Sequence, residues 1–265
     1  MSIYLELTRK FNHGRTRAIL AGGQAVVLHR LAIMSKDGDW ILREESESTE
    51  YVLSILEEYG ARYRFGAPLD VRWLAGGWSS HLEFQRQGMR VRTDFVTRPP
   101  RLDEDSLQRV WRGAEGQDVP FLGAVELANM KKTNREKDYA VIGELARKMS
   151  DVDDQLLHSR SARDLIGLVE QYPDRARRLA EKRPVLAMIG QGREALEAAL
   201  DAERRRLIRT NEERLGRYLD ASRPWAAMWP SLSRQMEELT LSAAHRLMVC
   251  QAETGLPFLV PGGWP

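Results

Sequence analysis

Two adjacent prolines, Pro99 and Pro100, separate a part of the chain that can form a sheet from a part with helical patterns. Proline has no backbone N–H to donate, so two in succession cannot continue a central strand. Before this point, short apolar runs alternate with glycine turns and helical spacing. After it, apolar residues recur mainly at helical spacing. The pattern predicts an α+β fold followed by a helical domain.

The expected elements follow from apolar periodicity and from glycine or proline stops. In the first part we expect helices at 3–12, 24–31 and 46–59, and strands at 17–21, 40–42, 70–74, 81–85 and 89–96. The later helices are expected at 122–131, 136–149, 162–171 and 193–219. A polar, acidic stretch near residue 150 suggests a boundary, which gives domains 1–150 and 151–265.

Composition limits the class of protein but does not identify a partner. The 40 basic and 38 acidic side chains leave a net charge of +2, so global charge does not indicate nucleic acid. The single cysteine, Cys250, cannot form an internal disulfide. No apolar run approaches the roughly 20 residues that span a bilayer, and no signal-peptide pattern is present. We therefore expect a cytoplasmic protein with no membrane partner.

Three aspartates and a glycine pair follow one another in an order that suits the binding of phosphates and divalent metal ions. Gly22-Gly23 ends an apolar run and opens a helical segment, and Asp37-Gly38-Asp39 follows after thirteen residues. Asp94 lies in a later strand segment. Carboxylates two apart on a strand point to the same face, where they can share divalent metal ions. A glycine turn that opens a helix presents backbone N–H groups to phosphates.

This arrangement resembles the signature of the polymerase-beta-like nucleotidyltransferase superfamily, in which Gly-Gly or Gly-Ser precedes Asp-x-Asp by a short spacer. The stretch GGQAVVLHRLAIMSKDGD is similar, without a gap, to the motif of the bacterial minimal, AbiEii-toxin-like subset, with His29 and Ser35 on its His and Thr positions. A second stretch, LANMKKTNREKDYAVIGELA, resembles that subset's later helix, in which a lysine precedes an Arg-x-Lys-Asp cluster. The likeness spans roughly residues 15 to 150.

The resemblance implies a minimal nucleotidyltransferase fold, a mixed sheet with flanking helices, that uses Mg²⁺ and a nucleoside triphosphate. It makes Asp37, Asp39 and Asp94 the catalytic residues and metal ligands. It assigns nucleotide contacts to Gly22, Gly23, Ser35, Lys131 and Arg135. The implied acceptor is an RNA such as tRNA, a protein or a small molecule. The implied biology is a toxin of a toxin–antitoxin system, with an antitoxin as partner.

Three positions depart from that motif and keep other readings open. Gly38 stands where the subset has a hydrophobic residue, Ile33 replaces an arginine and Arg30 replaces a glycine. A catalytically impaired member that binds a nucleotide, nucleic acid or protein is therefore the alternative. A helical interaction protein is a third. Asp37-Gly38 alone is typical of a turn, and arginines at 90, 92 and 98 are candidate ion-pair partners for Asp94.

Overall fold

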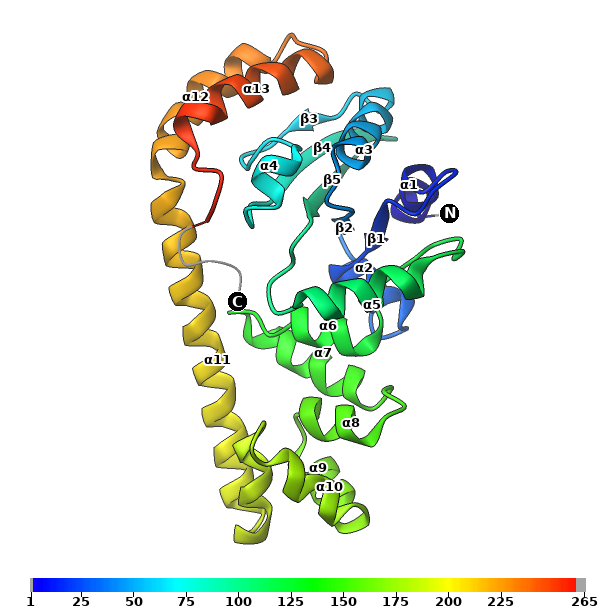
Figure 1. Cartoon of the computed structure of the whole chain (residues 1–265), viewed down its shortest axis with the longest axis vertical. Coiled ribbons are helices and arrows are strands. Elements are labelled where there is room, and N and C mark those ends of the chain that lie inside the picture. Colours follow the sequence, from blue (N-terminus) through cyan, green and yellow to red (C-terminus); the bar gives the residue numbers. More distant parts are fainter. Residues whose placement is uncertain (1, 261–265) are drawn as a thin grey trace. The chain divides into compact units, whose positions relative to one another are not determined.

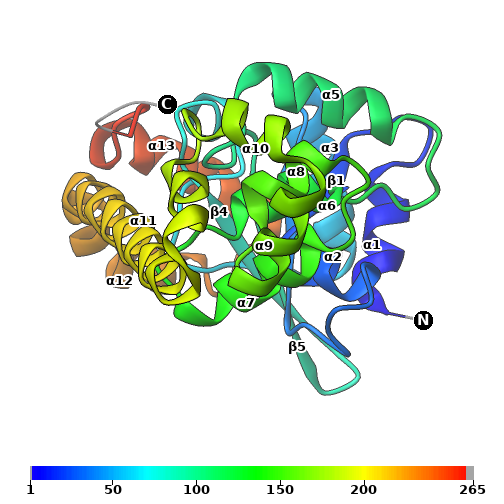
Figure 2. The same ribbon diagram turned by 90° about the horizontal axis from the view of Figure 1, so that it is seen from below.

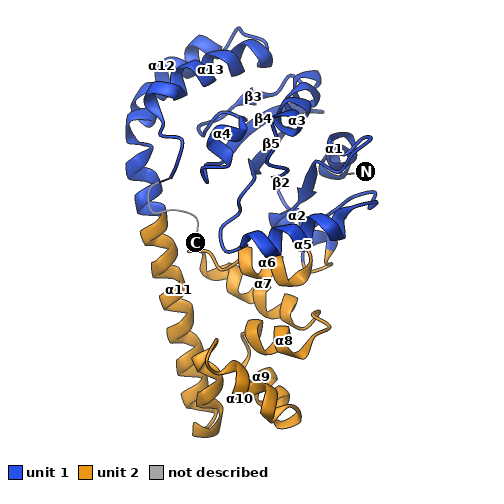
Figure 3. Ribbon diagram, in the orientation of Figure 1, with its two compact units in different colours: residues 1–28, 32–122, 215–265 blue, residues 29–31, 123–214 orange. Residues whose placement is uncertain are grey.

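The computed structural model describes residues 2–260, and its helices and strands are shown in Figure 1. Two compact units divide the chain (Figure 3). The second unit comprises residues 29–31 and 123–214, and the first comprises the other described residues. This division differs from the expected boundary at residue 150, because the last helices share a hydrophobic core with the sheet.

The first unit contains the whole sheet and the helices that pack on it. Its elements are α1 (Ile3–Phe11), β1 (Ala18–Leu20), α2 (Gly22–Leu28), β2 (Asp37–Leu42), α3 (Ser46–Glu58), β3 (Arg62–Tyr63), α4 (Val71–Leu74), β4 (Ser80–Arg86), β5 (Met89–Val96), α5 (Glu104–Ala114), α12 (Arg223–Met236) and α13 (Leu241–Gly255). The fold is α+β, as predicted.

The five strands form one mixed sheet in the order β1-β2-β5-β4-β3. β2 and β5 are parallel, and the other neighbouring pairs are antiparallel. The β4–β5 hairpin projects from the sheet (Figure 2) and turns at Gln87 and Gly88, whose φ angles are 51° and 75°. Two successive positive φ angles are typical of the tight turns that match the twist of a hairpin.

One face of the sheet packs against α1, α3, α12 and α13 in a continuous apolar core. Trp40 of β2 stacks on Phe95 of β5 with ring centroids 5.5 Å apart, and Phe11 of α1 meets Trp40 edge-on. The indole N–H of Trp40 donates to Thr8 Oγ1 at 3.0 Å, so this buried polar group is satisfied. In α12, Trp225 donates to the carbonyl of Gly66 at 2.9 Å. This core fixes how β2 and β5 lie beside one another.

The second unit is helical. It contains α6 (Ala124–Met130), α7 (Glu136–Ala146), α8 (Val152–His158), α9 (Ala162–Gln171), α10 (Pro173–Leu179), the 3₁₀ helix η1 (Pro184–Gln191) and most of α11 (Arg193–Ala221). Its apolar core includes Leu156, Leu165 and Leu196. Arg183 of the same unit donates two hydrogen bonds to Glu203, at 3.1 and 2.9 Å, and one each to two backbone carbonyls. A buried guanidinium is tolerated there because its donors are used.

The expected strands differ from the observed ones at two places. Residues 70–74, expected as a strand, form the short helix α4, because the Asp70 carboxylate accepts a hydrogen bond from the backbone N–H of Arg72 and caps the turn. The two-residue strand β3 was not expected, because a run this short has no detectable alternation. In the part of the chain that the structure describes, no helix is long and apolar enough to cross a membrane.

Candidate functional site

The second face of β2, β5 and β4 carries two parallel rows of polar side chains near the start of β2. The strand register places Asp39, Asp94 and His81 in one row. The other row runs Asp37, Arg92, Glu83 and Arg62. Residues two apart on a strand share a face, so both rows lie on the side opposite Trp40 and Phe95. Asp37 and Asp39 are therefore strand residues rather than part of a turn.

The two rows differ in how their charges alternate. In the second row, acidic and basic residues alternate from one strand to the next. Arg92 Nη1 lies 3.5 Å from Asp37 Oδ1 within this row, and Glu83 Oε2 lies 3.6 Å from Nε of Arg90, which is outside the row. In the first row, Asp39 and Asp94 are direct neighbours of like charge. Like charges side by side across strands are destabilising unless a cation compensates them.

Two side chains contact the carboxylate of Asp94. They are His81 of β4 and Arg64, the residue after β3. Arg64 Nη2 donates to Asp94 Oδ1 at 2.6 Å, and His81 Nδ1 lies 2.7 Å from the same oxygen. Burial by itself would raise the pKa of Asp94, but the hydrogen bonds and charges of His81 and Arg64 outweigh it and lower that pKa. The carboxylate is therefore ionised at neutral pH.

The glycine turn before α2 lies directly against Asp39. Gly22 has a φ of 53°, and a Cβ built there would come within 1.8 Å of Asp39 Oδ2. The backbone N–H of Gly23 donates to the same oxygen at 3.4 Å. Only glycine provides both the left-handed backbone and the space that the carboxylate occupies. The predicted glycine pair and the second aspartate are thus brought together.

The loop before β2 is held by Gln24 of α2, whose side-chain N–H₂ donates to the carbonyls of Ser35 and Asp37 at 3.0 and 3.2 Å. Ser35 lies next to Gly23, where a Cβ would come within 2.1 Å of the serine Oγ. The predicted residues Gly23 and Ser35 are therefore neighbours. In the same region Arg30, which replaces a motif glycine, has a φ of 60°, a conformation that favours glycine.

Gly38 has a packing role between the two aspartates. A Cβ there would come within 2.4 Å of the Trp40 ring and 2.5 Å of the Tyr4 ring. Tyr4 of α1 and Trp40 therefore occupy the space that a side chain at position 38 would fill. Its hydroxyl donates to the carbonyl of Lys36. Burial, followed by the charge of Asp37, raises the pKa of Tyr4. The absence of a side chain at Gly38 thus allows Tyr4 and Trp40 to pack closely against the strand.

Lys131 and Arg135 belong to the second unit, where both approach Asp138. Lys131 Nζ lies 3.6 Å from Asp138 Oδ1, and Arg135 Nη2 lies 2.9 Å from Oδ2. Thr133 Oγ1 donates to Asp138 Oδ2 at 2.6 Å. Asp138 is 4% exposed, so it is a fixed anionic anchor for both cations. The Lys-Arg-Asp pattern found in the sequence is thus a spatial cluster. A contact of Lys131 or Arg135 with a nucleotide stays a prediction.

The carboxylates match the donor chemistry that Mg²⁺ prefers. Asp37 Oδ1 is buried and makes no hydrogen bond, although Arg92 Nη1 lies 3.5 Å away, so the atom has coordination capacity that a bound metal ion can use. Within the described residues, no three His, Cys, Asp or Glu side chains are grouped closely enough to enclose a metal by themselves. Mg²⁺ is usually held by one or two carboxylates together with waters and substrate phosphates. The site therefore fits an ion that arrives with a triphosphate better than a permanently caged one.

Several residues of this site were not found by sequence reasoning. None of the arginines at 90, 92 and 98 pairs with Asp94 among the described ion pairs; Arg98 pairs with Glu44. The partners are Arg64 and His81. His81 was detectable, because the alternation of His81, Glu83 and Gln85 predicts a shared face. Arg64 carried no such signal, because it follows a strand of only two residues.

Comparison with known proteins leaves the family open. No protein-family profile matches the chain, and no curated protein has a significantly similar sequence. A structural search finds similarity to a crystal structure titled as a "putative nucleotidyltransferase from H. pylori". The two share 12% sequence identity, and the alignment covers 79% of this chain and 94% of the other, with a TM-score of 0.39. A likeness at this level carries no argument about the activity of this chain.

Proposed function

We propose that this chain is a Mg²⁺-dependent nucleotidyltransferase that moves a nucleoside monophosphate from a nucleoside triphosphate to an acceptor hydroxyl. The observation that carries the proposal is the direct pairing of Asp39 with Asp94 on parallel strands. Every neighbouring position in the adjacent row alternates in charge, so this one pair of like charges stands out as a place for a cation.

The residues of the site have different proposed roles in such a reaction. Asp37, Asp39 and Asp94 would hold divalent ions, which supply charge neutralisation and alignment of the attacking and leaving oxygens. Asp94, ionised because His81 and Arg64 lower its pKa against the effect of burial, can accept a hydrogen bond from the acceptor hydroxyl and orient it. Attack on the α-phosphorus breaks its bond to the β-phosphate oxygen and releases pyrophosphate.

The phosphates are proposed to lie against the turn at Gly22 and Gly23, beside Ser35. Backbone N–H groups at such a turn bind anions without a side chain. The motif resemblance also assigns nucleotide binding to Lys131 and Arg135, which both pair with Asp138. The motif resemblance supports an RNA, protein or small-molecule acceptor and a toxin role with an antitoxin partner.

A titration calorimetry experiment tests the site. Each of ATP, CTP, GTP and UTP is titrated with and without Mg²⁺ into the full chain and into the double variant Asp37→Asn/Asp39→Asn. The control is Glu45→Gln/Glu47→Gln, which also removes two negative charges two residues apart, in ion pairs with the exposed side chain of Arg15 and the buried side chain of Arg17. We expect Mg²⁺-dependent binding of at least one triphosphate, lost only in the aspartate variant. Binding that persists in that variant overturns the metal-site assignment.

A second candidate function is a member of the same fold that binds a nucleotide without transferring it. The ion pair between Arg64 and Asp94 favours this reading, because it occupies one oxygen of the third carboxylate. Incubation with each labelled triphosphate, total tRNA and cell lysate separates the two. A labelled product supports transfer, whereas Mg²⁺-dependent binding without any product across all four nucleotides supports the binding module.

A further inference from the structure

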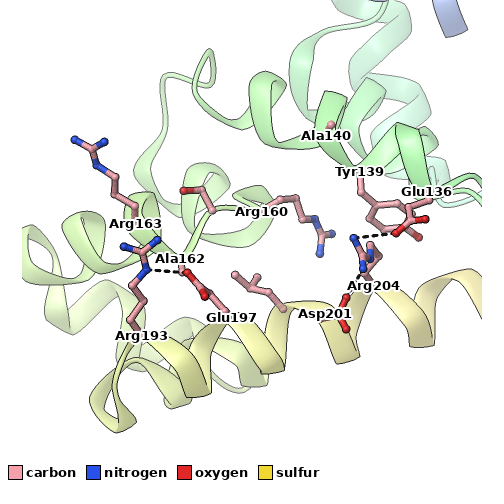
Figure 4. Close-up of a pocket in the computed structure, with 12 residues that line it drawn as sticks. Glu136, Tyr139, Ala140, Arg160, Ala162, Arg163, Arg193, Glu197, Asp201 and Arg204 are labelled. Atoms are coloured by element: carbon pink, nitrogen blue, oxygen red, sulfur yellow. Dashed lines mark hydrogen bonds and ion pairs between the residues drawn. The ribbon is translucent and has the colours of Figure 1, made fainter.

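The helical second unit contains a cavity of about 660 Å³ that the proposed transfer chemistry does not use. It lies between the start of α7, the start of α9 and the first half of α11 (Figure 4). Its volume falls within the range of pockets that bind small molecules. All the lining residues belong to this one unit.

Four arginines line this cavity. Arg160 and Arg163 flank the start of α9, and Arg193 and Arg204 lie on α11. Arg193 pairs with Glu197 at 2.7 Å, and Arg204 pairs with Glu136 at 3.2 Å and with Asp201. Arg163 is exposed and makes no ion pair within the described part of the chain. Positive side chains therefore outnumber the carboxylates on the wall.

Arg160 and Arg204, which both line the cavity, each have one unused donor. The Nε atom of each is buried and has no hydrogen-bond partner among the described residues. In Figure 4 the two guanidinium groups point toward one another. Two guanidinium groups that face each other favour an anion between them, although Arg160 also pairs with Glu203 and Arg204 with Glu136 and Asp201.

The positive charge of Arg160 is only partly compensated by the carboxylate of Glu203. Glu203 accepts hydrogen bonds from both Arg160 and Arg183, so one buried carboxylate faces two buried guanidinium groups. Burial is the main cause that lowers the pKa of Arg160, although Glu203 acts in the opposite direction. A positive charge thus remains on the floor of the cavity, where screening by water is weak.

We propose that this cavity binds a small phosphorylated sugar, with its phosphate between Arg160 and Arg204. The planar guanidinium fork matches phosphate oxygens, and charge-assisted hydrogen bonds to phosphate are the strong ones. The acidic wall residues Glu136, Glu197 and Asp201 accept hydrogen bonds from hydroxyl groups, which a sugar provides in number. The cavity volume suits one such molecule rather than a polymer. This site is independent of the carboxylates on β2 and β5.

The test uses the full chain, ribose 5-phosphate as probe and unphosphorylated ribose as its matched control, measured by titration calorimetry in EDTA at low salt. Arg204→Gln is expected to weaken ribose 5-phosphate binding by roughly tenfold or more, the effect of losing hydrogen bonds to a charged group. Arg205→Gln is the matched variant, because Arg205 is on the same helix, also pairs with Asp201 and does not line the cavity. It is expected to change affinity less than about twofold.

Arg160→Lys gives a second variant that keeps the charge but removes the guanidinium fork, and it is also expected to weaken binding. Equal effects of Arg204→Gln and Arg205→Gln overturn the proposal, as does equal binding of ribose and ribose 5-phosphate, or no binding at millimolar concentration. Binding of a ten-nucleotide RNA without binding of ribose 5-phosphate overturns it in favour of a polymer. Loss of ribose 5-phosphate binding in Asp37→Asn/Asp39→Asn overturns it by placing the ligand at the sheet.

Discussion

Asp39 on β2 and Asp94 on β5 are register partners in a parallel pair of strands, and Arg64 holds the second of these carboxylates at 2.6 Å. This pair concentrates negative charge on a face of the sheet where acidic and basic residues alternate in the neighbouring row. Arg64 therefore has two effects: it compensates Asp94 in the folded protein, and it competes with any cation that the pair binds.

Replacing Arg64 by Gln tests this relationship. The pKa of Asp94 is expected to rise, because one of the two groups that lower it is removed. A lowered carboxyl pKa contributes stability above the unfolded pKa of about 3.9, and that contribution is lost as pH falls through the folded value. The variant should thus lose about 1–3 kcal/mol of unfolding free energy at pH 7, and less at pH 3.

Urea unfolding at the two pH values and NMR titration of the Asp94 carboxyl measure these effects. Arg62→Gln is the control, because Arg62 is exposed and makes no ion pair within the described residues. An unchanged Asp94 pKa in Arg64→Gln contradicts the assignment of Arg64 as the compensating group.

Gly22→Ala and Gly60→Ala separate backbone strain from steric overlap at the site. Both glycines have left-handed φ angles, 53° and 64°, so each alanine should cost about 1–2 kcal/mol of stability. A Cβ at Gly60 meets nothing within 4 Å, whereas one at Gly22 overlaps the Asp39 carboxylate. Only Gly22→Ala is therefore expected to abolish Mg²⁺-dependent triphosphate binding in calorimetry. Equal binding by the two variants argues against a role for the Gly22 turn.

Gly38→Val restores the kind of residue that the related motif has between its aspartates, and we expect it to destabilise this protein. The new side chain meets Tyr4 and Trp40, so overpacking should cost about 1–3 kcal/mol in thermal or urea unfolding. Combining it with Tyr4→Ala should cost less than the sum of the single changes, with a coupling of about 1 kcal/mol. Strict additivity would falsify the view that Tyr4 fills the place of the missing side chain.

The sequence predicted those parts of the site that depend on local pattern. The strand segment around Asp94 and the order of the glycine pair and Asp37-x-Asp39 are visible along the chain, and the structure contains both. Strand order is not local. Nothing in the sequence states that β2 lies beside β5, because that pairing is set by packing of Trp40 on Phe95, which are 55 residues apart.

The same distinction explains why the roles of Gly38 and Arg64 are not visible in the sequence. The packing around Gly38 depends on Tyr4, which lies on a helix that precedes it by more than thirty residues. Arg64 meets Asp94 only because β4 lies between β3 and β5. A residue whose role depends on a third element carries no signature in its own segment.

His158 makes the second unit sensitive to acid. It is 4% exposed, and its pKa is lowered to about 4, first by burial and then by the charge of Lys132, with smaller effects of Arg183 and Arg160. Its Nδ1 donates to the carbonyl of Asp154 at 2.9 Å, a contact that partly opposes the shift. The ring is therefore buried in its neutral form, and protonation is easier in the unfolded chain.

The direction of the pH dependence follows from this difference. As pH falls from the unfolded value of about 6.5 to about 4, the unfolded state binds a proton that the folded state does not, so stability decreases. The free energy of unfolding of the wild type should fall by about 3 kcal/mol between pH 7 and pH 4, and this fall should be absent in His158→Gln. Urea unfolding across this range measures the slope, with hydrogen exchange in α8 as a local probe. The exposed His13→Gln should retain the wild-type slope. A slope in His158→Gln equal to that of the wild type would show that another group causes the acid sensitivity.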